Sequence, residues 1–281
     1  MQVIEHSWEV TPVVQAWQRE VLRTGFVPTM GNLHEGHLRL IDVARQKSDR
    51  VVVSVSVTPL QFWKNEDLVA YPRTLQDDLN KLKARDVDLV FTPSDEAMYP
   101  NGPAESTLVH VPAYLSAQLE GAYRPNHFAG VATVVSKLFH IVRPDLAVFG
   151  EKDFQQLRVI EKMVSDLNLG VEVIGEPTVR EADGLAMSSR NQYLSEAERK
   201  IAPQLYSTLR ETRERILKQN VELADLEQAA IMQLEQQGLI PDYVAIRHSE
   251  TLQESNSPTD PLVILAAVRL GNTRLIDNLR V

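Results

Sequence analysis

The chain has 281 residues, of which 43% are hydrophobic and 24% are charged, and it contains no cysteine. A chain of this size and hydrophobicity buries the core of one large domain or two smaller ones, which excludes disorder as its main state. The lack of cysteine excludes disulfides, cysteine zinc sites and thiol nucleophiles. The formal charge of −9 excludes a general affinity for nucleic acid, because such binding depends on a surplus of Lys and Arg.

The sequence contains no predicted membrane or export segment. The longest apolar runs, such as residues 51–60, are much shorter than the roughly 20 residues that a membrane helix needs. The first residues lack the basic start and the apolar block of a signal peptide. We therefore expect a cytoplasmic protein without a membrane partner.

The first two thirds of the chain alternate β-branched segments with amphipathic ones. Strands are predicted at residues 25–28, 51–57, 88–91, 146–149 and 171–174, and helices at residues 75–82, 128–142 and 157–167. Such alternation predicts an α/β fold, a parallel sheet with helices on both faces. The ligand site of such a sheet lies beyond the carboxyl ends of its strands.

The pattern changes near residue 178. One long polar helix is predicted over residues 195–218, with Ser195 as its N-cap, and a second over residues 223–236. Extended segments follow at residues 243–246, 263–268 and 273–276, and a Gly-Asn turn joins the last two as a hairpin. The sequence thus predicts two domains, residues 1–177 and 178–281, the second being a small C-terminal α+β domain.

The most informative motif lies between the first of these strands and a helix that begins near Gly36. It consists of Met30, Gly31, Asn32, Leu33, His34, Glu35, Gly36 and His37. At a helix N-terminus, unpaired backbone N–H groups and the helix dipole favour a phosphate, to which both imidazoles can donate. We expect Gly36 to let a nucleotide approach closely. The alternatives are two histidines without a ligand, or a metal pair, which the lack of a third ligand disfavours.

A second motif, residues 149–156, also follows a strand and precedes a helix. It places Lys152 where its ammonium group can reach a phosphate, and it places Gln156 about one helical turn later in the same crevice. The alternative is a helix start with solvated charges.

A third motif, residues 183–191, combines two hydroxyls with a guanidinium group in one loop. Ser188, Ser189 and Arg190 can close over a triphosphate. The alternative is an ordinary interdomain linker.

The three motifs, in this order and spacing, resemble the pantoate–β-alanine ligase family. The resemblance covers essentially the whole chain and is most specific up to residue 194. It continues through Ala70-Tyr71-Pro72-Arg73-Thr74, Met98-Tyr99-Pro100, Leu119-Glu120-Gly121, Arg124-Pro125, His127-Phe128, Lys137-Leu138-Phe139, Arg143-Pro144-Asp145 and Tyr193-Leu194. Residues 275–278 are also similar.

This resemblance implies a two-step ligation that consumes ATP. The carboxylate of pantoate attacks the α-phosphate of ATP, which gives pantoyl adenylate and pyrophosphate, and the amine of β-alanine then displaces AMP to give pantothenate. It also implies a Rossmann-like first domain, a C-terminal lid domain, a magnesium requirement and a homodimer.

The resemblance further assigns roles to residues of this chain. It implies catalytic roles for His34, His37, Lys152 and Arg190, and contacts of Gln61, Gln156 and Thr58 with pantoate. The implied ATP contacts are residues 30–37 together with Gly150, Glu151, Lys152, Asp153, Val179, Met187, Ser188, Ser189 and Arg190. Asp77 and Asp78 are the implied magnesium ligands. Alternatively, these two acids only favour the dipole of a helix that Thr74 caps.

The chain departs from the family pattern at the strand end before Gln61. Ser56 replaces an aromatic residue, and Thr58 replaces an asparagine that orients pantoate. Either hydroxyls and water take over the role of the amide, or the pocket binds pantoate more weakly or prefers another acid. We predict that Thr58→Asn combined with Ser56→Phe improves the KM for pantoate.

Two other function classes compete with the ligase. A related adenylyltransferase would have no reason to keep Gln61 and Gln156 as a pair. A non-catalytic nucleotide sensor would not need Lys152 and Arg190, because a sensor stabilises no transition-state charge.

Overall fold

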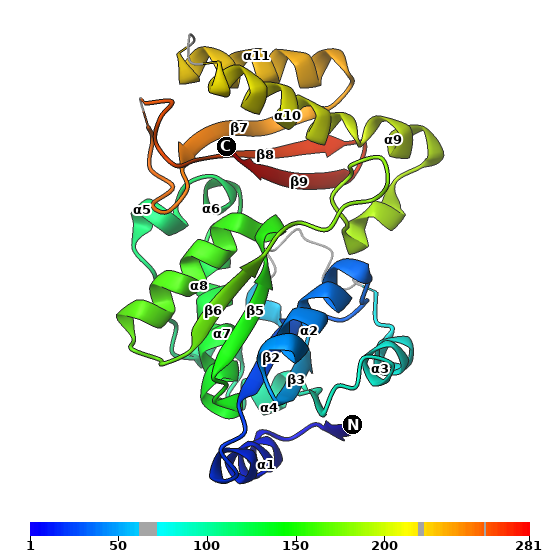
Figure 1. The fold of residues 1–281 in the computed structure, drawn as a ribbon, viewed down its shortest axis with the longest axis vertical. Helices are drawn as coiled ribbons and strands as arrows, with labels where there is room; N and C mark the ends of the chain where they lie inside the picture. The colour runs from blue at the N-terminus through cyan, green and yellow to red at the C-terminus, as the bar shows by residue number, and fades with distance from the viewer. Residues whose placement is uncertain (62–71, 219–221, 256) are drawn as a thin grey trace.

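The structure is a computed structural model that describes residues 1–61, 72–218, 222–255 and 257–281 (Figure 1). Within these ranges, no helix is both long enough and apolar enough to span a bilayer.

A six-stranded parallel sheet forms the centre of the first domain, with the strand order β1-β4-β3-β2-β5-β6. Its strands are β1 (Gln2–Ile4), β2 (Thr24–Thr29), β3 (Arg50–Val55), β4 (Leu89–Phe91), β5 (Leu146–Gly150) and β6 (Glu172–Glu176). The five predicted strands are confirmed within a few residues. The edge strand β1 was not predicted, because its three half-exposed residues carry no clear pattern.

Helices cover both faces of this sheet, as predicted. On one face, α1 (Ser7–Arg19), α7 (His127–Val142) and α8 (Phe154–Asp166) share a hydrophobic cluster with Phe26 of β2. On the other face, α2 (Glu35–Lys47) and α3 (Leu75–Lys83) pack against Val27, the next residue of the same strand. Successive strand residues point to opposite faces, which is why one strand supplies both clusters.

Short elements occupy the connections. They are η1 (Pro59–Gln61), α4 (Asp95–Met98), η2 (Pro103–Glu105), α5 (Ala113–Ser116), α6 (Glu120–Tyr123), η3 (Glu151–Asp153) and η4 (Ser189–Tyr193).

The C-terminal part is the predicted α+β unit. Its antiparallel sheet contains β7 (Ile240–His248), β8 (Leu262–Leu270) and β9 (Thr273–Arg280) in that order, and the predicted hairpin turn joins β8 to β9. The helices are α9 (Glu196–Ile201), α10 (Gln204–Leu217) and α11 (Leu223–Gln236). The prediction of one helix over residues 195–218 is wrong, because Pro203 has no N–H group to continue the hydrogen-bond ladder of α9.

The small sheet packs directly against the first domain. Figure 1 shows it above the parallel sheet, and Ala245 of β7 and Leu265 of β8 belong to the same hydrophobic cluster as α7 and α8. The small sheet also has its own cluster with α10 and α11. A boundary between residues 177 and 178 stays a prediction.

Candidate active site

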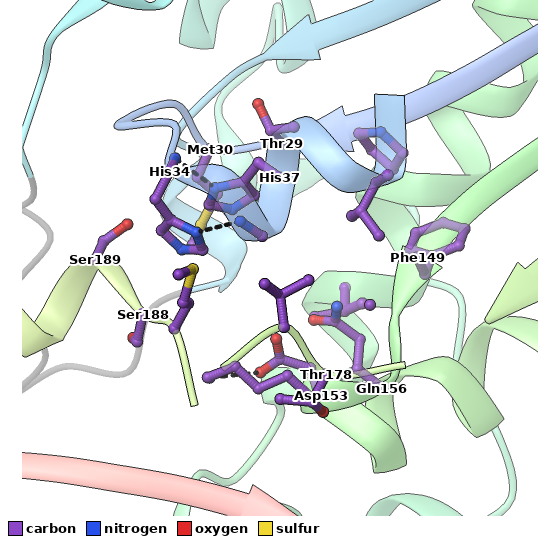
Figure 2. Close-up of a pocket in the computed structure, with 18 of the residues that line it drawn as sticks. Thr29, Met30, His34, His37, Phe149, Asp153, Gln156, Thr178, Ser188 and Ser189 are labelled. Carbon is purple, nitrogen blue, oxygen red and sulfur yellow. Dashed lines mark hydrogen bonds and ion pairs between the residues drawn. The ribbon is translucent and has the colours of Figure 1, made fainter. Parts of the chain in front are cut away.

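A cavity of about 230 Å³ lies at the carboxyl ends of β2 and β5 (Figure 2). These strands are neighbours in the sheet, and the chain order of the strands reverses between them. Ligands of open parallel sheets bind at this kind of reversal. The sequence placed the site at the end of the first predicted strand, which is β2.

The cavity brings together most of the predicted site residues. Those that line it are Met30, His34, Gly36, His37, Gly150, Lys152, Asp153, Gln156, Val179, Met187, Ser188, Ser189 and Arg190. In Figure 2, His34 and His37 lie on one side of the cavity, and Asp153 and Gln156 lie on another. All three motifs therefore contribute to one site.

Several other predicted residues do not line the cavity. They are Gly31, Asn32, Leu33, Glu35, Thr58, Asp77, Asp78 and Glu151. Glu151 turns instead toward Arg280, whose Nη2 donates to Oε1 at 2.8 Å. Gln61 ends η1, but its side chain lies outside the described part of the structure.

The two histidines are the N-cap and the N3 residue of α2. His34 Nδ1 accepts a hydrogen bond from Gly36 N at 3.1 Å, and His37 Nδ1 accepts one from His34 N at 3.3 Å. This reciprocal arrangement is a capping box that satisfies two otherwise unpaired N–H groups. Because Nδ1 accepts in both neutral rings, each proton lies on Nε2, where it is available for donation.

The surroundings keep both rings neutral. Burial lowers the pKa of His34 to about 4, with a further contribution from the charge of Lys152. Burial also lowers the pKa of His37 to about 3, and His34 and Lys152 contribute. The ring centroids are 4.0 Å apart, a distance at which two imidazolium ions repel strongly. The pair is therefore a double Nε2–H donor near neutral pH, which fits a phosphate chain.

The lack of a side chain at Gly36 makes room for the ring of His34 as well as for a ligand. A Cβ at this position would lie 2.8 Å from His34 Cε1 and 2.9 Å from its Nδ1. The prediction that this glycine admits a nucleotide is compatible with its place on the cavity wall. The more direct reason is the ring of His34, which folds back over the glycine to cap the helix.

The first motif is fixed by Asp78, a residue predicted as a magnesium ligand. Its carboxylate is fully buried and accepts hydrogen bonds from Asn32 N and Leu33 N, both at 2.8 Å, and from Thr74 Oγ1 at 3.2 Å. Asp77 is exposed on α3. This pair does not fit a magnesium site, because Asp78 has its oxygens committed to the backbone. The described residues also contain no cluster of three or more His, Asp or Glu side chains suited to a metal.

The second and third motifs meet the first around the cavity. Lys152 follows β5 in η3, and its Nζ lies 3.9 Å from the carboxylate of Asp153. Ser189 Oγ donates to the carbonyl of Asn32 at 3.2 Å, so the third motif is joined directly to the first. Lys152 and Arg190 together place two positive charges at a site whose histidines are neutral.

Sequence reasoning missed part of the cavity wall. Arg124 and His127 also line the cavity, and Arg124 Nη1 lies 2.9 Å from His127 Nε2. The sequence marks both residues only as parts of motifs that resemble the family. Val131, Val134 and Leu138 of α7 line it as well, although helical periodicity alone marks them as core. Periodicity shows that a face is buried, but it does not distinguish a core from an apolar pocket.

The two residues after β3 that depart from the family pattern, Ser56 and Thr58, lie in different environments. Ser56 lines the cavity. Thr58 is 0% exposed and does not reach the cavity, and its hydroxyl lies against that of Tyr99. The structure therefore does not bring Thr58 to the place where a pantoate ligand was predicted.

The chain matches the Pantoate-beta-alanine ligase family model over residues 2–280. It is 54% identical over 279 residues to a pantothenate synthetase of Pseudomonas fluorescens, covering 99% of this chain and 97% of the relative. The crystal structure of pantothenate synthetase from Thermus thermophilus superposes with a TM-score of 0.92 at 47% identity, covering 99% of each chain.

A second solved structure carries ligands. Pantoate-beta-alanine ligase from Francisella tularensis, complexed with beta-gamma ATP and beta-alanine, has a TM-score of 0.81 at 33% identity and covers 100% of this chain and 97% of its own. These matches extend over both sheets and all three motifs. The chain belongs to the pantoate-beta-alanine ligase family, a family of ligases.

Proposed function

We propose that this protein condenses pantoate with β-alanine at the expense of ATP, through a pantoyl-adenylate intermediate. The observation that carries this proposal is the composition of the cavity. Phosphate donors from three separate motifs and an apolar wall with Gln156 line one cavity. ATP and the acid can thus lie side by side, as a direct attack of carboxylate on phosphate requires.

The first step needs alignment and charge stabilisation more than proton transfer. The pKa of a carboxylic acid is about 4, so pantoate is already an anion at neutral pH and needs no general base. Its oxygen forms a bond to the α-phosphorus, and the bond to the pyrophosphate oxygen breaks. The Nε2–H groups of His34 and His37, with Lys152 and Arg190, stabilise the charge that develops on the phosphates.

The pantoate pocket is formed by α7, β5 and α8. Pantoate carries two methyl groups on one carbon and two hydroxyls. Val131, Val134 and Leu138 provide an apolar surface for the methyl groups, and the amide of Gln156 provides a donor and an acceptor for the hydroxyls. We expect Gln61 to supply a second amide.

The second step transfers the acyl group to nitrogen. The neutral amine of β-alanine attacks the acyl carbon, the bond from that carbon to the AMP oxygen breaks, and the amine proton passes to solvent. β-Alanine keeps its carboxylate throughout both steps. Arg124 lies in the segment before α7, next to His127 at the start of that helix, and it adds a positive charge to the cavity wall. We propose that Arg124 orients this carboxylate.

Magnesium and a homodimer are expected from the family resemblance alone, and a cytoplasmic location is expected from the sequence pattern. The described residues offer no acidic pair for magnesium, so we propose that the ion arrives on the phosphates of the nucleotide. No step above depends on a metal ligand from the protein.

The test is pyrophosphate release with ATP, magnesium and pantoate, measured with and without β-alanine. We expect release to require pantoate, and pantothenate and AMP to form when β-alanine is added. Release that requires a different acid would indicate an altered pocket at Ser56. ATP binding without release with any acid would overturn the proposal in favour of a nucleotide sensor.

A further inference from the structure

The last strand of the small domain contacts the turn that carries Lys152 and the loop that leads to Arg190. We propose that Asn278 of β9 is a positioning residue that sets the direction of Lys152, and that its neighbour Asp277 fixes the opposite loop. This inference rests on the proposed function, because it assumes that Lys152 acts on the phosphates of ATP.

Asn278 holds the two peptide groups that flank the Cα of Lys152. Its Nδ2 donates to the carbonyl of Glu151 at 2.8 Å and to the carbonyl of Lys152 at 2.9 Å. These carbonyls belong to the peptide units before and after Lys152 Cα. Fixing both units fixes the φ and ψ of Lys152, and with them the direction in which its side chain leaves the turn.

The amide of Asn278 is itself held in place. Asn278 is only 6% exposed, and its backbone N donates to Asp277 Oδ1 at 2.8 Å. The Nδ2 group of this buried amide thus donates both of its hydrogen bonds to the turn that carries Lys152. A polar group with this degree of burial is expensive to leave unpaired, so the geometry is well determined.

Asp277 acts on the loop across the cavity. Its 3%-exposed carboxylate accepts from Arg180 Nη1 at 2.6 Å and from Arg180 Nη2 at 3.0 Å. Arg180 also donates to the carbonyl of Gly184 at 3.1 Å, and its guanidinium lies 3.6 Å from the ring centroid of Tyr206. A backbone hydrogen bond from Met187 N to the carbonyl of Val179 closes this loop just before Ser188. The dipeptide 277–278 therefore joins the Lys152 turn to the loop that carries Ser188, Ser189 and Arg190.

Lys152 depends on this support because its ammonium group is not held by a short contact with its neighbouring acid. Its Nζ is 3.9 Å from the carboxylate of Asp153, which is beyond hydrogen-bond distance. Its side chain is 20% exposed and therefore also packed, but the hydrogen bonds that orient this residue are those on its backbone. A displacement of about 1 Å in a group that aligns reactants can cost on the order of a hundredfold in rate.

The test is a double-mutant cycle between Asn278→Ala and Lys152→Ala, read out as the rate of pantoate-dependent pyrophosphate release. We expect Asn278→Ala to slow release about tenfold or more in the wild-type background, and less than twofold when Lys152 is already alanine. Such non-additivity identifies an effect that passes through Lys152. Aminolysis of preformed pantoyl adenylate by β-alanine should slow much less, because it involves no triphosphate.

The matched control is Arg280→Ala, which removes another β9 contact with the same turn but reaches side chains alone, the carboxylate of Glu151 and the ring of Phe154. We expect its release rate to stay within twofold of wild type. Asn278→Ser keeps a single donor and should give an intermediate rate, so it serves if the alanine variant does not fold. Thermal melting of every variant separates positioning from loss of the folded state.

Equal rate losses from Asn278→Ala in both backgrounds, or no loss in either, would overturn the inference. If the wild-type protein shows no pantoate-dependent release, the proposed function fails instead. The same cycle measured on the Kd for ATP then still tests whether Asn278 acts through Lys152.

Discussion

His34 and His37 serve the fold and the site with different nitrogens. Nδ1 of each ring caps α2, while Nε2 is left for a ligand. The sequence motif indicated a helix N-terminus with two histidines, and the structure places both histidines there. The tautomer follows from the two capping hydrogen bonds, whereas the low pKa values depend on burial and on the charge of Lys152, which no local pattern encodes.

The low pKa of His37 predicts how stability changes with pH. A histidine whose folded pKa lies below its unfolded value of about 6.5 stabilises the fold above that pH, and this stability is lost as the pH falls toward the folded value of about 3. His37→Gln keeps an acceptor for the cap but does not titrate. We expect the free energy of unfolding, measured by urea denaturation, to fall less between pH 7 and pH 5 in this variant. An unchanged pH dependence would show that His37 titrates normally.

Substitutions of Asp78 and Asp77 distinguish a structural role of these acids from a role in binding magnesium. Asp78→Asn replaces one acceptor oxygen by a donor that faces the backbone N–H groups of Asn32 and Leu33, which should cost about 1–3 kcal/mol in unfolding free energy and raise the KM for ATP. Asp77→Asn is the control. We expect it to leave the magnesium concentration for half-maximal activity unchanged, whereas a severalfold rise would restore Asp77 as a metal ligand.

Ser56 is the residue through which the chain can differ from its family in acid binding. Because Ser56 lines the cavity and Thr58 does not, we expect Ser56→Phe alone to lower the KM for pantoate by adding apolar contact. Thr58→Asn should instead cost about 1–3 kcal/mol by overpacking a buried site. Steady-state kinetics and thermal melting of both single variants check this division. A better KM from Thr58→Asn alone would contradict it.

At the scale of elements, α2 shows how a helix start is adapted to the site. Gly36 is in the first turn, where alanine would favour the helix by up to about 1 kcal/mol. The added Cβ would lie 2.8 Å from His34, so the ring must move. We expect Gly36→Ala to raise the KM for ATP at least tenfold while the melting temperature changes little. Unchanged ATP kinetics would show that the position of the His34 ring is not critical.

The observed helices show what the spacing of apolar residues can predict and what it cannot. The spacing of apolar residues identified α3, α7 and α8 because buried faces repeat every three to four residues. The same spacing did not reveal the break at Pro203, since both α9 and α10 continue the polar pattern. It also did not show that α7 turns part of its apolar face toward a cavity.

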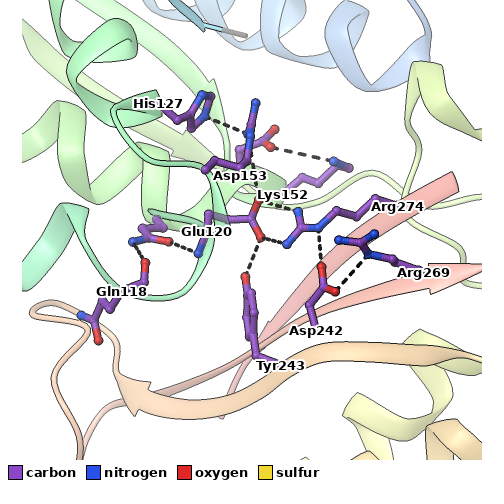
Figure 3. A network of polar contacts seen from close by, with 11 residues as sticks. Gln118, Glu120, His127, Lys152, Asp153, Asp242, Tyr243, Arg269 and Arg274 are labelled. Carbon is purple, nitrogen blue, oxygen red and sulfur yellow. Dashed lines mark hydrogen bonds and ion pairs between the residues drawn. The ribbon is translucent and has the colours of Figure 1, made fainter. Parts of the chain in front are cut away.

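At the scale of the whole molecule, a largely buried ionic network joins the small sheet to helix α6 of the first domain (Figure 3). Glu120 of α6 is 8% exposed and accepts from Arg274 Nη1 at 2.7 Å, from Arg274 Nη2 at 2.8 Å and from Tyr243 Oη at 2.9 Å. Burial opposes the ionisation of Glu120, but its hydrogen bonds with Arg274 and the charge of that residue outweigh burial and lower its pKa. These contacts tie the small domain to the segment that carries Arg124.

Glu120→Gln leaves Arg274 without its main countercharge. Removing one partner of a buried pair typically costs about 3–5 kcal/mol, so we expect a loss of that order in unfolding free energy. Arg269→Ala, at a side chain that is 60% exposed, is the control and should cost less than about 1 kcal/mol. Denaturation by guanidinium chloride measures both. Equal losses would show that the network adds nothing beyond surface ion pairs.

The net charge of −9 describes the whole chain and not the cavity. Within the described structure, the cavity is lined by Arg124, Lys152 and Arg190 but by a single carboxylate, Asp153. An acidic protein thus presents a locally cationic site. The net charge disfavours nucleic acid as a general partner, while the placement of a few side chains favours a small polyanion.

The sequence by itself determined the α/β architecture, the helix start near Gly36 and the three motifs, because these depend on residues that are close along the chain. Only the tertiary structure decided that Asp78 holds a loop, that Thr58 is buried and that Asn278 supports Lys152. Each of these depends on contacts between segments that are tens to more than a hundred residues apart. The packing of two sheets brings such segments together, and no local periodicity records which polar groups then meet.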